Sequence, residues 1–440
     1  MNRVIYCAIA VALFISSCKK ETQTEYRIVH PDTTSSTSIT LSIEKVINDS
    51  TITLKWNKTG GPRFKQYMLA RMSTTFQNGS FINNYTTLKT FSNPDSLSFT
   101  EKSMPFAPDI QYTVYSQTDS VQYSIYSSVT YHRPNTYITA AFSDIVPDIQ
   151  HKVMYMISRE SGTVTAVDYA NYKLIKTVNV GNVLGYSALG SYNGTNNELY
   201  LPTADGWLYI YDTATLTLKD KIYVQGPEVG SVVAADGLLF VSSSDMSYDG
   251  FYDNAVKIYD RKTKKVLGIT GVWDYTRLML LPNSKYKLID ITFNLAPTDL
   301  NLYTISADGK PLTKTPDSYH GDHALSGNIL SAFPDGSHFI TAASGAVYTK
   351  DLLYEKDMAR PGSAYTDFAV NNAGNIIYAA SANTAQVDLI SYPSGTILKS
   401  LKTKLYPAKL FIDGNQLICI TADRYHGTNN YAFFVEKFNL

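Results

Sequence analysis

Residues 206–212 read GWLYIYD, and the same pattern recurs as GTVTAVD at residues 162–168 and as NAVKIYD at residues 254–260. Each copy is a short apolar run that ends on an aspartate and is followed by a turn and a lysine-rich stretch. Runs of this length, rich in Val, Ile, Tyr and Thr and bounded by turn residues, are typical of β-strands. The stretch therefore predicts a repeated unit built from strands.

A short apolar strand opens each repeat, and seven such strands are spread over the C-terminal part of the chain. They begin at residues 153, 199, 238, 287, 338, 376 and 416, so successive repeats start 38 to 51 residues apart. A period of this size with three or four strands per unit is typical of a β-propeller. The sequence therefore predicts an all-β protein with a seven-bladed β-propeller over residues 136–440.

The ends of this region suggest how the ring closes. A propeller must join its last blade to its first, because open ends would expose unpaired strand edges. The seventh repeat supplies a third strand at residues 431–440 and then stops. We therefore expect residues 137–142 to form the outer strand of the last blade.

The repeat phrases that end on Asp168, Asp212 and Asp260 resemble those of YVTN/YncE-like seven-bladed propellers, within the larger quinoprotein-dehydrogenase-like group. The Gly-His and Trp-Asp dipeptides of WD repeats do not recur, and only Trp207 and Trp273 fall in this region, so the tryptophan docking motif of true quinoprotein blades is missing. We expect the three aspartates to accept hydrogen bonds from backbone amides in the following turns.

The N-terminal residues read as a targeting segment. A short positive start is followed by an apolar run at residues 4–15, which is too short to span a bilayer as a mature helix. The run ends in ISSC at residues 15–18, which resembles the lipobox of bacterial lipoproteins and implies lipid attachment to Cys18. The next residues, KKE, resemble the start of Bacteroidetes-type surface lipoproteins. We expect a signal peptide at residues 1–17 and a tether at residues 18–37.

Residues 38–133 carry about seven short strands, at residues 39–46, 51–56, 66–72, 96–100, 111–116 and 122–131 among others. Their number and alternation predict a β-sandwich. With LKW at residues 54–56 and YTVY at residues 112–115, the region resembles a fibronectin type III module. The remaining mature cysteine, Cys419, lies in an apolar strand and is expected to be a small core residue.

Composition narrows the range of partners. The chain has 38 Lys and Arg and 38 Asp and Glu among 440 residues, so no net field favours nucleic acid. Tyrosine is abundant, with 34 copies against 18 Phe and 3 Trp, and it suits both strands and wet stacking surfaces. We expect a monomer that is anchored at the outer membrane by a lipid on Cys18 and exposed at the cell surface.

Three long loops are expected on one face of the propeller, around the central channel. The loop at residues 242–254 carries three carboxylates and two of its tyrosines in close succession: Asp245, Tyr248, Asp249, Tyr252 and Asp253. The carboxylates could hold calcium, although the spacing matches no EF-hand. The tyrosines could instead stack on a sugar ring, and an ordinary solvated loop is the third interpretation.

The second loop, residues 316–326, carries Tyr319, His320, Asp322 and His323. Two imidazoles three residues apart with nearby carboxylates could bind a transition metal or act as acid and base, or they could form a polar surface.

The third loop, residues 422–430, carries Arg424, Tyr425 and His426, and its Tyr-His-Gly triplet matches the one at residues 319–321. These loops supply the candidate ligand-binding residues, and no catalytic residue, metal or cofactor other than calcium is predicted.

Three functions remain open from the sequence. The resemblance to YncE-like propellers implies a non-catalytic protein that binds a glycan, peptide or partner protein on this face. The alternative is a lyase, lactonase or hydrolase that uses His320, His323 or His426 as a base, with Arg424 holding an anionic group. The third is a structural component of an envelope assembly. No Gly-x-Ser-x-Gly, phosphate-binding loop or His-Glu-x-x-His motif is present.

Overall fold

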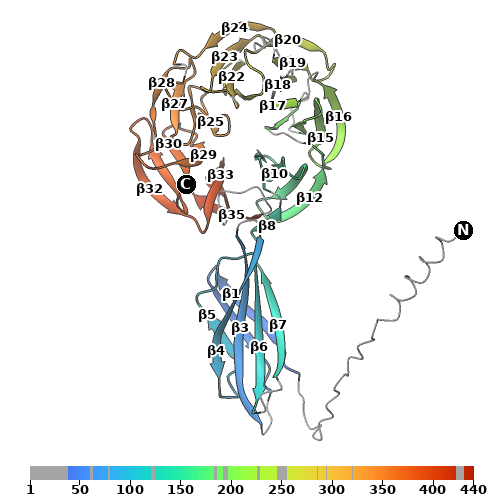
Figure 1. Cartoon of the computed structure of the whole chain (residues 1–440), viewed down its shortest axis with the longest axis vertical. Helices are drawn as coiled ribbons and strands as arrows, with labels where there is room; N and C mark the ends of the chain where they lie inside the picture. Colours follow the sequence, from blue (N-terminus) through green and yellow to red (C-terminus); the bar gives the residue numbers. More distant parts are fainter. Residues whose placement is uncertain are drawn as a thin grey trace, which may run out of the picture.

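The chain forms an elongated N-terminal unit of strands joined end-on to a broad ring of sheets (Figure 1). The computed structural model describes residues 38–59, 63–77, 80–119, 124–139, 141–182, 186–191, 197–224, 228–244, 255–284, 286–293, 295–319, 321–422 and 431–440. Every regular element in these residues is a β-strand, which confirms the all-β class. The targeting segment, the tether and Cys18 lie outside the described residues.

Two antiparallel sheets make up the N-terminal unit and share one apolar core. Their orders are β1-β2-β5 and β4-β3-β6-β7. Trp56 lies in this core, where its ring contacts Tyr67 and Phe91 at centroid distances of 5.8 and 5.5 Å. The strands are β1 (Leu41–Asn48), β2 (Thr51–Trp56), β3 (Phe64–Gln77), β4 (Ser80–Phe91), β5 (Ser98–Glu101), β6 (Asp109–Thr118) and β7 (Ser124–His132). The Asn- and Thr-rich strand β4 was not predicted from the sequence, because it has few apolar residues.

The rest of the chain forms seven four-stranded antiparallel sheets in the described residues, arranged in a propeller-like ring (Figure 1). Sheet 1 contains β9 (Asp144–Asp148), β10 (Val153–Ser158), β11 (Thr163–Asp168) and β12 (Lys173–Asn179). Sheet 2 contains β13 (Ala188–Gly190), β14 (Glu198–Pro202), β15 (Trp207–Asp212) and β16 (Thr217–Tyr223). Sheet 3 contains β17 (Glu228–Ala235), β18 (Leu238–Ser244), β19 (Val256–Asp260) and β20 (Val266–Thr270).

The following sheets repeat this order. Sheet 4 contains β21 (Thr276–Leu280), β22 (Lys287–Thr292), β23 (Leu300–Ile305) and β24 (Pro311–Pro316). Sheet 5 contains β25 (Leu330–Ala332), β26 (His338–Thr341), β27 (Ala346–Thr349) and β28 (Tyr354–Asp357). Sheet 6 contains β29 (Tyr365–Val370), β30 (Ile376–Ser381), β31 (Gln386–Ser391) and β32 (Thr396–Lys402). Each strand predicted to open a repeat is the second strand of its sheet, and the first strand of each sheet was missed.

Sheet 7 joins the two ends of the ring region. It contains β33 (Tyr406–Asp413), β34 (Gln416–Ala422) and β35 (Tyr431–Asn439), and β8 (Thr136–Thr139) pairs with β35 as its outer strand. The predicted strand exchange is therefore confirmed, although the strand is shorter than residues 137–142. Phe142 still packs on Phe433, with ring centroids 4.8 Å apart.

An apolar cluster fills each junction between neighbouring sheets, including the junction of sheet 7 with sheet 1. Cys419 is fully buried in the cluster between sheets 6 and 7, as predicted, and burial raises the pKa of its thiol. Packing between faces, rather than any covalent link, thus holds the described part of the ring together.

The turn aspartates have the predicted role. Asp168 accepts hydrogen bonds from the amides of Ala170 and Asn171. Asp212 accepts the equivalent bonds from the amides of Ala214 and Thr215. Burial opposes ionisation of Asp212, but these bonds together with the Thr215 hydroxyl lower its pKa below the ordinary value. Each such turn also sits beside a β-bulge between the third and fourth strands, which recurs in sheets 1 to 6.

The two units touch at the base of the ring. Phe106 of the N-terminal unit packs on Phe434 with centroids 4.7 Å apart, and the buried guanidinium of Arg133 covers Phe106 at 4.2 Å. Arg133 also donates to the carbonyls of Asp49 and Pro105. The connection is therefore a packed contact as well as a chain crossing.

Candidate functional site

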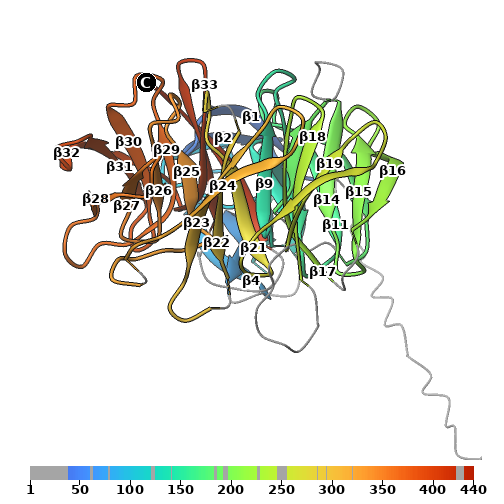
Figure 2. The ribbon, with the colours of Figure 1, turned by 90° about the horizontal axis from the view of Figure 1, so that it is seen from above.

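The ring has two faces with different connections, because neighbouring strands in every sheet are antiparallel. Turns between first and second strands and between third and fourth strands share one face, which we call the turn face. Links between second and third strands and between successive sheets share the other, which we call the loop face. The strands run between these two faces in Figure 2. The described strands that flank the three predicted loops end on the loop face.

The structure describes only part of those loops. Nine of the predicted ligand-binding residues lie outside the described residues: Asp245, Tyr248, Asp249, Tyr252, Asp253, His320, Arg424, Tyr425 and His426. Tyr319, Asp322 and His323 are described, in the link between β24 and β25.

Two of these three residues pack against the side of sheet 5. The Tyr319 hydroxyl accepts a hydrogen bond from the Tyr354 amide at 3.2 Å, and its ring joins the apolar cluster between sheets 4 and 5. His323 stacks on Tyr354, with centroids 3.6 Å apart and planes 8° from parallel. Asp322 is exposed. Tyr319 and His323 therefore anchor this loop to the outer strand of the next sheet.

A different group of side chains meets on the loop face near the centre of the ring, beside the first strands of sheets 2 to 5, and we call it the channel-mouth cluster: Tyr186, Tyr275, Arg277, Phe293 and Asn328. The Tyr186 ring stacks on Phe293 (5.4 Å, 7°), and Tyr275 packs on Phe293 at 5.2 Å. The guanidinium of Arg277 lies 3.5 Å from the centre of the Tyr186 ring. The Tyr186 hydroxyl donates to Asn328 Oδ1 at 2.5 Å.

Backbone contacts explain how residues of sheets 2, 4 and 5 meet there. The amide of Tyr186 donates to the Gly230 carbonyl, and its own carbonyl accepts from Val232, so the segment before β13 is bonded to β17. The next residue, Ser187, donates its amide to Asp144 of β9 at 2.8 Å. Tyr186 is thereby directed across the channel towards sheets 4 and 5. A side chain at Gly327 would place its Cβ 2.8 Å from Phe293, so this close approach requires glycine.

A hollow of about 300 Å³ lies beneath the cluster, bounded by Tyr186, Arg277 and the first strands of sheets 2 to 5. Apolar residues such as Val233, Leu280 and Leu330 line it, and Arg277 is the one charged residue among its lining residues in the described part of the chain. Arg277 donates to the Gly327 carbonyl at 3.2 Å. Burial raises the pKa of Tyr186, and Arg277 partly offsets this effect. The cluster thus combines flat aromatic surfaces with a fixed guanidinium, a set suited to a ring-shaped ligand that carries an anion.

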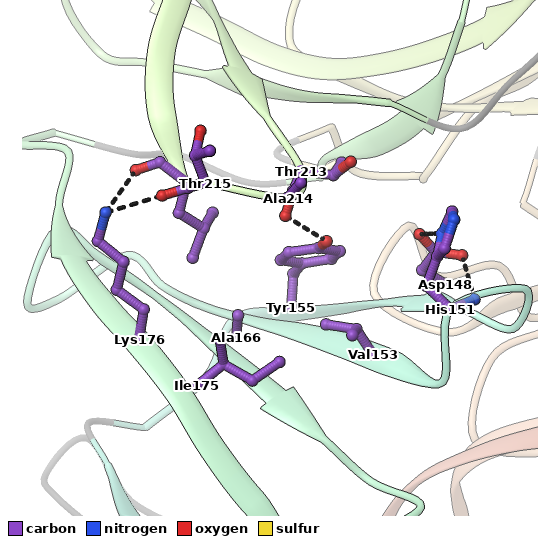
Figure 3. A pocket seen from close by; sticks show the side chains of 11 residues that line it. Asp148, His151, Val153, Tyr155, Ala166, Ile175, Lys176, Thr213, Ala214 and Thr215 are labelled. Carbon is purple, nitrogen blue, oxygen red and sulfur yellow. Dashed lines mark hydrogen bonds and ion pairs between the residues drawn. The ribbon is translucent and has the colours of Figure 1, made fainter.

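A second concavity lies on the turn face between sheets 1 and 2, and we call it the inter-sheet cleft (Figure 3). It has a volume of about 260 Å³. Val153, Tyr155 and Ile175 of sheet 1 form its floor, and residues 213–216 of sheet 2 form its roof. The Tyr155 hydroxyl donates to the Thr213 carbonyl at 3.1 Å.

Polar groups stand at the two ends of the cleft (Figure 3). At one end the ammonium of Lys176 donates to the Thr215 carbonyl at 2.8 Å. At the other, the buried carboxylate of Asp148 accepts from the amide and Nδ1 of His151, at 3.2 and 2.8 Å. Because Nδ1 of the half-exposed His151 is bonded to Asp148, its Nε2 atom remains available to bond a ligand.

No group of three or more His, Cys, Asp or Glu side chains is arranged to hold a metal among the residues that the structure describes. The predicted calcium loop, with Asp245, Asp249 and Asp253, is outside them. Nor does the described part of the chain contain a helix long and apolar enough to cross a membrane.

With this geometry in view, we compared the chain with known proteins. No protein-family model matches it, and no curated protein is significantly similar to it. The site must therefore be interpreted from its own residues.

Sequence reasoning missed both sites because neither follows a local motif. Tyr186 and Asn328 are 142 residues apart, and only the ring brings them into contact. One usable signal existed: Arg277 is the only charged residue in the otherwise apolar run TRLML of β21. A charge inside a strand that faces a channel indicates a functional position.

Proposed function

We propose that this chain is a cell-envelope lipoprotein in which a fibronectin type III-like sandwich carries a seven-bladed propeller of the YVTN/YncE-like kind. Seven successive four-stranded sheets and the strand β8 shared between the two ends of the ring support the propeller assignment. The ISSC sequence at residues 15–18 supports a lipid anchor on Cys18 and attachment to the outer membrane, with the ring displayed at the cell surface.

The function that the geometry favours is non-catalytic binding of a glycan at the loop face, with an acidic sugar at the channel-mouth cluster. The observation that carries this proposal is the hollow lined by Tyr186 and Arg277, beside which Phe293 stacks on Tyr186 and Tyr275 packs on Phe293. Aromatic faces stack on sugar rings, and a guanidinium pairs with a carboxylate through two parallel hydrogen bonds. Because Tyr186 and Gly327 already hold the guanidinium in place, little side-chain freedom is lost on binding.

The catalytic alternative would need His323 to face the channel together with His320 and His426. The partly exposed His323 instead stacks on Tyr354 at the side of sheet 5, so its ring is held there rather than beside Arg277. His320 and His426 lie outside the described residues.

A structural role in an envelope assembly has one observation in its favour. The outer strands of sheets 1 to 3 expose the apolar side chains Leu174, Ile175, Leu218, Val266 and Ile269. Such side chains could meet a protein partner at the rim of the ring, away from the channel mouth.

Binding of short acidic and neutral oligosaccharides to the purified full chain tests the glycan proposal. We expect a tetramer of galacturonic acid to bind and Arg277→Met to weaken its binding at least tenfold, because a charged hydrogen-bonded pair contributes about 1.5–3 kcal/mol. Arg360→Met, which removes an exposed arginine from the same face, is the matched control and should leave binding unchanged. Equal binding by wild type and Arg277→Met, or a preference for the neutral galactose tetramer, would reject the proposal.

A further inference from the structure

The inter-sheet cleft occupies a position that is filled elsewhere in the ring. In all seven sheets a residue at or just after the end of the third strand donates its amide to the carbonyl just before the second strand. The pairs are Tyr169 to Lys152, Thr213 to Asn197, Arg261 to Gly237, Ile305 to Tyr286, Lys350 to Ser337, Tyr392 to Asn375 and Leu440 to Asn415. This shared bond makes these residues equivalent, and we call the position they occupy the seam position. Its side chain is directed at the preceding sheet.

A large side chain fills the seam between sheets 7 and 1. Tyr169 packs on Phe411 with centroids 5.2 Å apart and donates its hydroxyl to Asp413 at 3.1 Å. The seam between sheets 5 and 6 is filled in the same way. There Tyr392 packs on Phe333 at 4.9 Å and donates to Glu355 at 2.5 Å.

The seam between sheets 2 and 3 is filled by a charged side chain, Arg261, instead of a tyrosine. Arg261 donates through Nε and Nη2 to the buried Glu198, at 2.7 and 2.9 Å, and through Nη1 to Asp220 at 3.2 Å. In these three seams a planar group occupies the space: a phenol ring twice and a guanidinium once.

The seam between sheets 1 and 2 lacks such a group. Its seam residue is Thr213, and Val153 stands at the register position that Glu198 holds in sheet 2 and His338 holds in sheet 5. Two short side chains thus replace long ones, and the cleft of about 260 Å³ is the space they leave. Both residues line the cleft.

The polar groups that line the cleft suit an anionic ligand. The roof carbonyls of Thr213 and Thr215 are already bonded to Tyr155 and Lys176. Asp148, the one carboxylate among the lining residues described, is buried and bonded by His151. The cation at the roof therefore faces no competing free carboxylate in the cleft, and the apolar floor suits a flat ring.

From these contacts we propose that the inter-sheet cleft binds a small aromatic carboxylate. Its ring lies on Val153, Tyr155 and Ile175, in the space that Tyr169 or Tyr392 fills in other seams, and its carboxylate pairs with Lys176. This site is on the opposite face from the channel-mouth cluster and is independent of the glycan proposal.

Benzoate is the probe for this proposal, with neutral benzamide as its uncharged analogue. Binding to the purified full chain is measured by saturation-transfer NMR and calorimetry. We expect Thr213→Tyr to abolish benzoate binding, because the new ring fills the cleft as Tyr169 fills its own seam. Lys176→Met should weaken benzoate at least tenfold while leaving benzamide unchanged. Lys399→Met is the matched control: Lys399 pairs with Leu389 beside the same bulge in sheet 6 as Lys176 pairs with Ala166, and both lysines are exposed, but Lys399 does not line the cleft.

Three outcomes overturn the proposal. The first is the absence of saturable benzoate binding to the wild type. The second is benzoate affinity that is equal in wild type, Lys176→Met and Lys399→Met, which would place the anion elsewhere. The third is unchanged binding in a folded Thr213→Tyr variant. The thermal transition shows whether Thr213→Tyr folds. If it does not fold, the benzoate affinities of Lys176→Met and Lys399→Met still test the proposal, because equal affinities would reject it.

Discussion

Asp290 offers a test of how the ring tolerates a buried acid. It lies in β22 and is fully buried, and it accepts hydrogen bonds from Asn301 and Tyr303 at 3.0 Å each. Burial raises its pKa from an ordinary value of 3.8 to about 7, although these two bonds act in the opposite direction. No cation is bonded to Asp290 among the contacts of the described residues, so desolvation dominates.

The sign of the effect follows from the direction of the shift. The folded protein holds the Asp290 proton at pH values where the unfolded chain has released it. The stabilisation that comes from keeping Asp290 protonated in the folded state is therefore complete below about pH 4. It is lost as the pH rises through about 7. A pKa difference of about 3 corresponds to about 4 kcal/mol, which is a large share of the stability of a typical domain.

We therefore expect Asp290→Asn to be more stable than the wild type at about pH 8, by up to about 4 kcal/mol, and to lose most of this advantage at about pH 5. The neutral amide can keep the bond from Tyr303. In the wild type, Asn301 Oδ1 has no hydrogen-bond partner among the described residues. If the Asn301 side-chain amide flips, the new amide at position 290 can donate to this oxygen. Urea unfolding followed by tryptophan fluorescence at several pH values measures the difference.

The matched control is Asp388→Asn in sheet 6. Asp388 is also buried and bonded to a tyrosine, Tyr365, but it receives further bonds from Gln386 and Ser400. Because the charged acceptor serves three donors there, its replacement should lower stability at neutral pH. Parallel stability curves for wild type and Asp290→Asn from about pH 5 to about pH 8 would refute the reasoning about Asp290.

Two further predictions concern other buried groups. Arg261→Met should destabilise the ring by up to about 3 kcal/mol in thermal or urea unfolding, because the buried Glu198 then keeps Lys219 as its only charged partner among the described contacts, and adding Glu198→Gln should recover much of the loss. A single Arg261→Met change with no measurable cost would contradict this. Cys419 should resist a thiol reagent in the native protein and react on unfolding, since burial raises its pKa and blocks access. Rapid labelling of the folded chain would disprove its placement.

Much of the architecture was predictable because each strand carries its own local signal. Strands such as Trp207–Asp212 were predicted with their final bounds, and the turn role of Asp212 followed from side-chain chemistry. The exchange of β8 into sheet 7 followed from the need to close the ring. The first strands were missed, and they share no common pattern, since their lengths range from three residues to eight. Ala188–Gly190 has only three residues, and sheet pairing defines it more than sequence does.

Tyrosine usage shows what the sequence could not tell. We expected tyrosine to fill strands or cover wet surfaces. The structure adds a third role, in which a buried phenol donates to a buried carboxylate. Tyr303 bonds Asp290 at 3.0 Å, and Tyr365 bonds Asp388 at 3.0 Å. Such pairs satisfy an acid inside a sheet without a cation, but the partners are recognisable only once the strand register is known.

The candidate sites lie beyond sequence reasoning for a related physical reason. In a ring of repeats, every seam is built from the same positions, so a binding site is a place where one repeat departs from the others. The seam residues Tyr169, Thr213, Arg261 and Tyr392 are all visible in the sequence, but their equivalence is apparent only from the shared backbone bond. Once that equivalence is known, Thr213 stands out as the residue too short to fill its seam. The cleft is then a consequence of one side chain's length, and Thr213→Tyr is the change that removes it.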